Sequence, residues 1–146
     1  MKPQNEMSVS FLSCSANESF GRAAVAAFAA QLDPTLDELS DIKTAVSEAV
    51  TNCIVHGYKD KIGVIYITCK LYPGAISIRI RDKGCGIPDV KQAMEPLFTT
   101  AGDERAGLGF AVMESFMDTL RVTSKVGKGT VVSMKKTIAS RQKDHV

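Results

Sequence analysis

Two pairs of alternating segments constrain the fold of this chain most strongly. Residues 64–71 and 75–81 alternate apolar with polar side chains, and a Tyr-Pro-Gly turn joins them. Residues 120–126 and 130–137 repeat this pattern around a Gly-Lys-Gly turn. Alternation is typical of strands with one buried face, and such short connections make each pair an antiparallel hairpin. The sequence therefore predicts a mostly antiparallel sheet with one covered face.

The remaining segments predict what covers that face. Residues 7–11 alternate again and predict a first strand. Residues 15–32 open with the capping-box pattern Ser-x-x-Glu and are rich in alanine, which indicates a helix. Further helices are expected over residues 35–57, where Gly57 would form a left-handed cap, and over residues 107–117. This order predicts an α+β fold, an α/β sandwich with helices on one face of a mostly antiparallel mixed sheet.

Length and composition predict one domain, residues 1–146, with a polar tail from about residue 138. No apolar run approaches the roughly 20 residues that span a bilayer, and the N-terminus lacks the apolar core of a signal peptide. We therefore expect a cytoplasmic protein without membrane contact. The net charge of +2 gives no reason to expect nucleic-acid binding. The four cysteines form no C-x-x-C pair, which argues against a zinc site or a disulfide framework.

One predicted helix carries polar side chains along the border of its apolar stripe. The stripe, at spacings of three and four, consists of Ile42, Ala45, Val46, Ala49 and Cys53. Glu48, Asn52 and His56 are each four residues apart and follow one border of the stripe. This row either faces a ligand between the helix and its neighbours or is the polar edge of an ordinary amphipathic helix.

Two glycine motifs further along the chain favour a ligand. Asp82-x-Gly84-x-Gly86 follows a strand, where a carboxylate can project toward a pocket while the glycines let a ligand approach the backbone. Gly107-x-Gly109 is predicted at a helix N-terminus, whose free amides favour phosphate. Asn52 offers a carboxamide oxygen, which suits Mg²⁺. Residues 87–106 show no clear periodicity, as is typical of a functional lid.

In this order and spacing, the motifs resemble a known superfamily. Residues 48–52, 82–88 and 107–109 look like the N, G1 and G2 boxes of the Bergerat-fold ATPases and kinases, which include gyrase B, the histidine kinases and MutL. The match narrows to the sporulation anti-sigma F factors, which are resembled by residues 47–52, 56–58, 96–100 and 113–118. The resemblance extends from about residue 6 to residue 136.

The resemblance implies a site for ATP or ADP with Mg²⁺. Asp82 is expected to bind the adenine amino group, Asn52 to hold Mg²⁺, and Glu48 to act as the general base. Further nucleotide-binding residues are expected at Gly84, Gly86, Thr99, Thr100, Arg105, Gly107, Gly109 and Thr130. The chain departs from the family pattern between Thr100 and Gly107, where the expected lysine-proline start is absent, so that Arg105 becomes the cation expected to reach the γ-phosphate. Cys85 is an unusual occupant of the G1 box.

The implied function is that of an anti-sigma factor that is also an ATP-dependent protein serine kinase. It would hold a sporulation sigma factor, sigma F, when ATP is bound, and it would phosphorylate an anti-anti-sigma protein on serine. A homodimer is expected. A general-stress anti-sigma kinase and a nucleotide-dependent binding module without kinase activity are the alternatives. An ATP-hydrolysing clamp is disfavoured because no transducer domain follows, and a histidine kinase because neither His56 nor His145 lies in a phosphoacceptor helix.

Arg22 is the residue expected to bind these partners. The core-facing side of its helix is predicted to consist of Phe20, Ala24, Ala27 and Phe28. Arg22 would then be exposed beside Ala26 and Ala29, a setting in which arginine commonly anchors interfaces. An alanine-rich helix selected for helix propensity alone is the alternative. The resemblance implies that Arg22 meets both the sigma factor and its antagonist.

Overall fold

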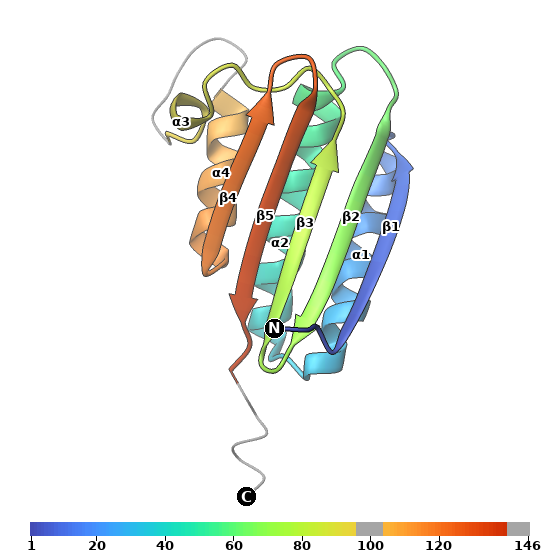
Figure 1. Ribbon diagram of the computed structural model, residues 1–146, viewed down its shortest axis with the longest axis vertical. Coiled ribbons are helices and arrows are strands. Elements are labelled where there is room, and N and C mark those ends of the chain that lie inside the picture. Colours follow the sequence, from blue (N-terminus) through green and yellow to red (C-terminus); the bar gives the residue numbers. More distant parts are fainter. Residues whose placement is uncertain (96–103, 140–146) are drawn as a thin grey trace, which may run out of the picture.

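The computed structural model describes residues 1–95 and 104–139. Its centre is a five-stranded sheet with the strand order β1-β2-β3-β5-β4 (Figure 1). The strands are β1 (Asn5–Leu12), β2 (Val64–Tyr72), β3 (Ala75–Asp82), β4 (Thr119–Lys125) and β5 (Gly129–Thr137). The four pairings between these strands are all antiparallel. Both predicted hairpins and the predicted first strand are therefore confirmed.

Helices cover one face of this sheet (Figure 1). They are α1 (Ala16–Ala29), α2 (Leu36–Asn52), α3 (Val90–Ala93) and α4 (Glu104–Phe116). A 3₁₀ turn extends α1 and a π turn, Cys53–Gly57, extends α2, which packs against both α1 and α4. The predicted α+β fold with helices on one face is thus confirmed. Within the described residues, no helix combines the length and apolar character that a bilayer crossing needs.

The core lies between the sheet and α2. The predicted apolar stripe is buried along its whole length, from Ile42 to Cys53. It packs against the inward side chains of the central strands, including Ile65, Ile67, Ile76, Ile78 and Ile80. Each Å² of apolar surface removed from water stabilises the fold by about 25 cal/mol, so this interface holds α2 firmly on the sheet. Glu48 and Asn52, on the border of the stripe, are fixed with it.

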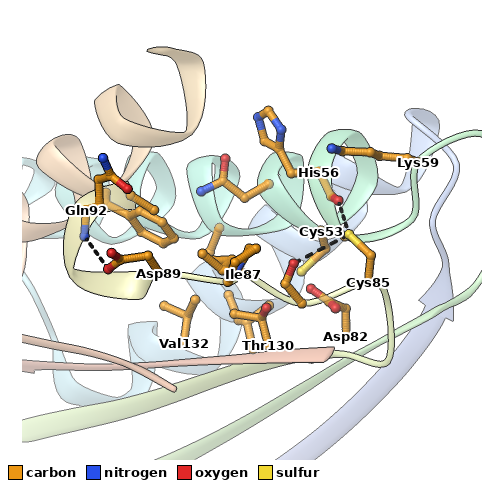
Figure 2. A pocket seen from close by; sticks show the side chains of 18 residues that line it. Cys53, His56, Lys59, Asp82, Cys85, Ile87, Asp89, Gln92, Thr130 and Val132 are labelled. Atoms are coloured by element: carbon orange, nitrogen blue, oxygen red, sulfur yellow. Dashed lines mark hydrogen bonds between the residues drawn. The ribbon is translucent and has the colours of Figure 1, made fainter. Parts of the chain in front are cut away.

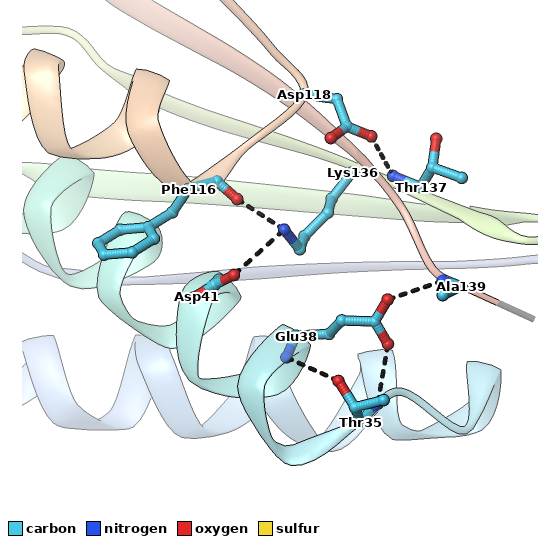
Figure 3. A network of polar contacts seen from close by, with 8 residues as sticks. All are labelled: Thr35, Glu38, Asp41, Phe116, Asp118, Lys136, Thr137 and Ala139. Carbon is cyan, nitrogen blue, oxygen red and sulfur yellow. Dashed lines mark hydrogen bonds and ion pairs between the residues drawn. The ribbon is translucent and has the colours of Figure 1, made fainter.

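Polar contacts join the start of α2, the end of α4 and the end of β5 (Figure 3). Lys136 of β5 is only 9% exposed, and its Nζ donates to the Phe116 carbonyl at the end of α4 at 2.7 Å. The same Nζ forms an ion pair with Asp41 of α2 at 3.4 Å. Glu38 and Thr35 form a capping box at the start of α2, and Glu38 also accepts the backbone N–H of Ala139 at 2.7 Å. These contacts fix α2 and α4 along the sheet.

The predicted faces of α1 are wrong. Gly21, Val25, Ala26 and Ala29 are buried, whereas Phe20 is 50% exposed. The reason is that α1 packs against α2 as well as against β1 and β2, so its buried side is rotated toward its neighbouring helix. The predicted capping box is also not formed, because Ser15 has helical backbone angles and its side chain makes no capping hydrogen bond.

Two predicted helix ends differ from the structure. Gly57 is not a left-handed cap, because the chain continues from α2 into the π turn and Gly57 is not among the glycines with positive φ. Helix α4 begins at Glu104, three residues before the predicted start at Gly107. Glu, Arg and Ala at positions 104–106 have high helix propensity, which favours the earlier start. Gly107 and Gly109 therefore lie inside the first two turns of α4.

Candidate functional site

A cavity of about 210 Å³ lies between the end of α2, strands β3 and β5, and α3 (Figure 2). Ile80, Phe110 and Val132 supply apolar walls. Asn52, Asp82 and Thr130 supply polar groups. A concave and mostly apolar site with a few placed polar groups is typical of a pocket for a small organic molecule or cofactor.

Asp82 lies at the sheet side of this cavity and is the most deeply buried carboxylate in it. It is 4% exposed, and its Oδ1 accepts the backbone N–H of Gly84 at 2.9 Å. Burial raises the pKa of Asp82, while hydrogen bonds from Gly84, the Cys53 thiol and the Thr130 backbone oppose that rise. A buried carboxylate with spare acceptor capacity is suited to bind an N–H donor of a ligand.

The Cys53 thiol beside Asp82 was not predicted as part of the site. Burial raises the pKa of this thiol well above the usual value, and the charge of Asp82 and the hydrogen bond to it act in the same direction. Cys53 is therefore a neutral donor that orients the carboxylate. The helical spacing of three and four identified Cys53 only as a core residue, because sequence alone does not reveal that β3 ends against this turn of the helix.

Glycines bring the loop after β3 close to its neighbours. A β-carbon at Gly84 would lie 2.0 Å from the carbonyl oxygen of Gly57, so only glycine fits there. Gly86 has φ of +78°, and a β-carbon there would meet the carbonyl of Lys125 at 2.3 Å. These glycines therefore let the loop pack against the π turn that follows α2 and against the end of β4 and the residue after it.

Two hydroxyl groups hold the same loop in place, and sequence reasoning missed both. The Tyr58 hydroxyl donates to the Val64 carbonyl and accepts the backbone N–H of Lys83, each at 2.6 Å. The Ser124 hydroxyl accepts the Ile87 N–H at 2.7 Å and lies 2.8 Å from the Thr130 hydroxyl. Tyr58 is part of the His-Gly-Tyr run, so the resemblance offered a signal for it, whereas Ser124 offered none beyond its place in a strand.

Cys85, the unusual residue in the G1 box, is exposed. Its thiol Sγ lies 3.1 Å from the carbonyl oxygen of His56, to which it donates (Figure 2). Its backbone N–H donates to Gly57 at 2.9 Å. The loop keeps its geometry with cysteine at this position, because the backbone makes the contact that holds it.

Asn52 and Glu48 lie where α2 meets α4. A β-carbon at Gly109 would be 3.2 Å from Glu48 Oε2 and 3.2 Å from Asn52 Nδ2, so the glycine lets α4 approach both side chains. Among the described residues, the buried Asn52 Nδ2 has no hydrogen-bond partner. An amide donor without a partner beside a cavity fits a ligand acceptor such as a phosphate oxygen, and the oxygen of the same carboxamide is a hard ligand of the kind that Mg²⁺ prefers. The residues present therefore fit a magnesium–nucleotide complex.

The structure brings together most of the predicted residues that it describes. Asn52, Asp82, Gly86 and Thr130 line the cavity, and Gly84 is bonded to Asp82. Glu48 is not in the cavity wall but lies one helical turn from Asn52, against Gly109. Thr99 and Thr100 lie outside the described residues, and for Arg105 and Gly107 the structure gives only their place in the backbone of α4. Arg22 does not line the cavity; it lies on α1, where it contacts Glu18 and Ser47.

Comparison with known proteins places this site in a family. Residues 17–136 match the family described as "Histidine kinase-like ATPase domain". The anti-sigma F factor of Thermoanaerobacter sp. (strain X514) is 59% identical over 96% of this chain and 99% of the relative. The anti-sigma F factor of Geobacillus kaustophilus (strain HTA426) is 54% identical over 93% of this chain and 94% of the relative.

A solved structure supports the fold independently. The RsbU and RsbW domains of a Mycobacterium tuberculosis protein superpose with a TM-score of 0.69 at 19% identity. The match covers 95% of this chain and 34% of that longer chain. At this identity the likeness shows the fold alone. From the family match and the curated relatives together, the chain belongs to the anti-sigma F factor family and carries a nucleotide-binding domain of the histidine kinase-like ATPase type.

Proposed function

We propose that the chain is an ATP-dependent anti-sigma factor and protein serine kinase. The observation that supports this best is the buried Asp82 carboxylate beside an open cavity, in a chain 59% identical to an anti-sigma F factor. Asp82 accepts the adenine amino group, and Gly84 and Gly86 leave room for the base. Thr130 stands beside Asp82 and supports the adenine end of the site.

The phosphates lie toward Asn52 and α4. Asn52 holds Mg²⁺ through its carboxamide oxygen, and the ion, when bound, neutralises charge on the phosphate oxygens. Gly107 and Gly109 keep side chains away from the phosphates, and Gly109 is packed against Asn52. Thr99, Thr100 and Arg105 complete the phosphate end, with Arg105 as the cation for the γ-phosphate.

Glu48 takes the proton from the substrate hydroxyl. As the serine oxygen of the anti-anti-sigma protein bonds to the γ-phosphorus, the bond to the bridging oxygen of ADP breaks, and the serine proton passes to the Glu48 carboxylate. Its position beside Gly109, one turn from Asn52, supports this role because the reacting γ-phosphate belongs on this side of the cavity. The products are phosphoserine and ADP.

The sigma factor is the partner of the ATP-bound state. The curated relatives reported above are all named anti-sigma F factors, which favours a sporulation sigma factor, sigma F, over a general-stress factor. Arg22 contacts both the sigma factor and its antagonist, so that the two compete. The functional unit is a homodimer.

Pulldown and phosphate transfer test this proposal together. The purified chain is incubated with ATP and Mg²⁺ or with ADP and Mg²⁺, and sigma factors captured from a lysate are identified. Capture of a sporulation sigma factor with ATP and much less with ADP is the expected result. Radiolabelled ATP should then label a serine of the anti-anti-sigma protein. Sigma capture without any labelling would favour a nucleotide-dependent binding module instead.

A further inference from the structure

The four cysteines differ sharply in their access to solvent. Cys53 and Cys69 are 3% and 0% exposed and belong to the core, and Cys14 is half-buried. Cys85 is exposed. A thiol reacts as its thiolate, and only where a reagent can reach the sulfur. Cys85 is therefore the position at which a thiol-directed reagent would modify this chain first.

The thiol of Cys85 lies in the wall of the cavity, at the end where adenine is proposed to bind. On one side of it, the Gly84 N–H donates to Asp82 Oδ1 at 2.9 Å. The Cys85 Sγ lies 3.1 Å from the His56 carbonyl oxygen and 3.5 Å from that of Gly86 (Figure 2). A group attached to this sulfur would therefore take up space in the cavity beside Asp82.

Two further residues indicate what shares the cavity with this thiol. The buried Asn52 Nδ2 has no hydrogen-bond partner among the described residues, which points to a ligand independently of the cysteine. Lys59 is exposed and lies on the same wall as Cys85 (Figure 2). Among the described residues that line the cavity, it is the one lysine or arginine. Its ammonium group would attract acidic reagents to this wall.

We propose that Cys85 is a modification site, at which an acidic low-molecular-weight disulfide closes the nucleotide cavity. The Cys85 thiol first loses its proton to solvent. Its thiolate then attacks one sulfur of the disulfide, so that a new S–S bond forms as the old one breaks. The released thiolate takes up a proton. The Cys85 sulfur is thereby oxidised and one sulfur of the reagent is reduced, and an excess of free thiol reverses the exchange.

This modification would regulate the proposed function, on which the inference rests. The attached group and the nucleotide need the same space, so each lowers the affinity of the chain for the other. The ATP-bound state is the one proposed to hold the sigma factor. Modification of Cys85 would therefore release the sigma factor, and bound nucleotide would protect the thiol.

Oxidised glutathione, an acidic disulfide, is the probe for a test on the full chain. Peptide mapping by mass spectrometry should find the adduct on Cys85, and saturating ADP with Mg²⁺ should suppress its formation. Calorimetry should show ATP affinity at least about tenfold lower in the modified wild type, and dithiothreitol should restore it. In Cys85→Ser, the ATP affinity should be the same before and after treatment.

Two further variants sharpen the test. Cys14→Ser removes the half-buried thiol, which does not line the cavity, and should respond to oxidised glutathione like the wild type. Lys59→Met should slow modification by oxidised glutathione but not by neutral 2-hydroxyethyl disulfide. Equal rates of modification in Lys59→Met and the wild type with both reagents would overturn the preference for an acidic reagent.

Three results would overturn the modification site itself. An adduct on Cys85 that leaves ATP affinity unchanged would show that the thiol is exposed without closing the cavity. Equal modification with and without ADP would place the sulfur outside the space that nucleotide fills. An adduct found on another cysteine would contradict the assignment to Cys85. If the untreated chain binds no ATP, the proposed function fails, and the closing of its site fails with it.

Discussion

The carboxylate of Asp82 packs directly against the backbone of Gly57, where a β-carbon would lie 2.7 Å from Asp82 Oδ2. The end of β3 therefore meets the π turn that follows α2 without room for a side chain between them. This contact explains why glycine occupies position 57 although it is not a left-handed cap. It also shields one side of Asp82 from water and leaves the cavity as its open side.

Asp82→Asn should strongly weaken the binding of adenine nucleotide. The amide puts an N–H donor where the carboxylate accepts, and the loss of one such buried bond costs about 1–3 kcal/mol, or roughly ten- to a hundredfold in affinity. Titration calorimetry with ATP measures the effect. Asp89→Asn is the matched control, because Asp89 also lines the cavity but its Oδ1 caps α3 at Gln92. Unchanged ATP affinity in the Asp82 variant would remove this residue from the site.

Glu48→Gln should keep ATP binding and sigma-factor binding but lose phosphate transfer. Glutamine preserves the shape beside Gly109 and cannot accept the serine proton, so transfer should slow by roughly a hundredfold or more. Single-turnover labelling of the anti-anti-sigma protein measures transfer, and calorimetry measures ATP binding in parallel. Transfer at the wild-type rate would show that Glu48 only orients its neighbours.

The strands and the apolar stripe of α2 were predictable because their periodicity is strong. Val64 to Tyr72 alternates along its whole length, and Ile42 to Cys53 keeps helical spacing. In α1 the contrast is weak, because alanine occurs on every side and fits buried and exposed positions alike. The predicted capping box at Ser15 failed for a related reason: the pattern permits a capping bond, and the backbone angle at Ser15, which decides it, is not encoded in those four residues.

The candidate site was predictable only where a motif carries it. Asp82, Asn52 and the glycines stand in recognisable motifs, whereas Ser124 acts through the pairing of β4 with β5 and Cys53 through its contact with the end of β3. Such contacts join residues far apart in the sequence. They depend on how the elements pack, which local spacing does not determine.

Tyr58→Phe should loosen the loop that carries Asp82 and Gly84. Without the hydroxyl, the N–H of Lys83 and the carbonyl of Val64 lose their partner in part-buried hydrogen bonds, which costs about 1–3 kcal/mol of folding free energy. ATP affinity should fall with it. Chemical denaturation and calorimetry measure the two effects. Tyr72→Phe, at the end of β2, is the control and should change stability by no more than about 0.5 kcal/mol. If Tyr58→Phe and Tyr72→Phe change stability and ATP affinity equally, the Tyr58 hydroxyl is not needed to hold the loop.

Lys136→Met should displace α4 although it lies at the far end from the cavity. The Phe116 carbonyl and Asp41 lose their shared partner, which should lower the free energy of unfolding by about 1–3 kcal/mol. Because α4 carries Gly109 against Asn52, ATP affinity should fall as well. Lys135→Met changes the neighbouring exposed lysine and should alter stability by about 0.5 kcal/mol at most. Wild-type ATP affinity in the Lys136 variant would show that core packing alone positions α4.

Arg22 has different surroundings from those that the sequence predicted. Its Nη1 lies 3.2 Å from Glu18 Oε1 and 3.3 Å from the Ser47 hydroxyl, so it bridges α1 and α2. Ala26 and Ala29, expected beside it on the surface, are buried. The side chain is nevertheless 39% exposed, which leaves much of the guanidinium open to a partner.

Arg22→Glu should therefore weaken the sigma factor and the anti-anti-sigma protein together while ATP binding stays intact. Loss of an arginine anchor costs about 2 kcal/mol or more in a protein interface, and the reversed charge adds repulsion. The variant also places a second carboxylate one turn from Glu18, which destabilises the helix by only about 0.2–0.5 kcal/mol.

Glu18→Gln is the matched control, because it breaks the same ion pair without removing the arginine. Titration of purified sigma factor into each ATP-loaded variant separates the two explanations. If Arg22→Glu and Glu18→Gln weaken sigma-factor binding equally, the effect comes from the lost ion pair within α1 and not from a lost contact between Arg22 and the partner. If Arg22→Glu leaves the dissociation constant of the sigma factor unchanged, the partners dock elsewhere.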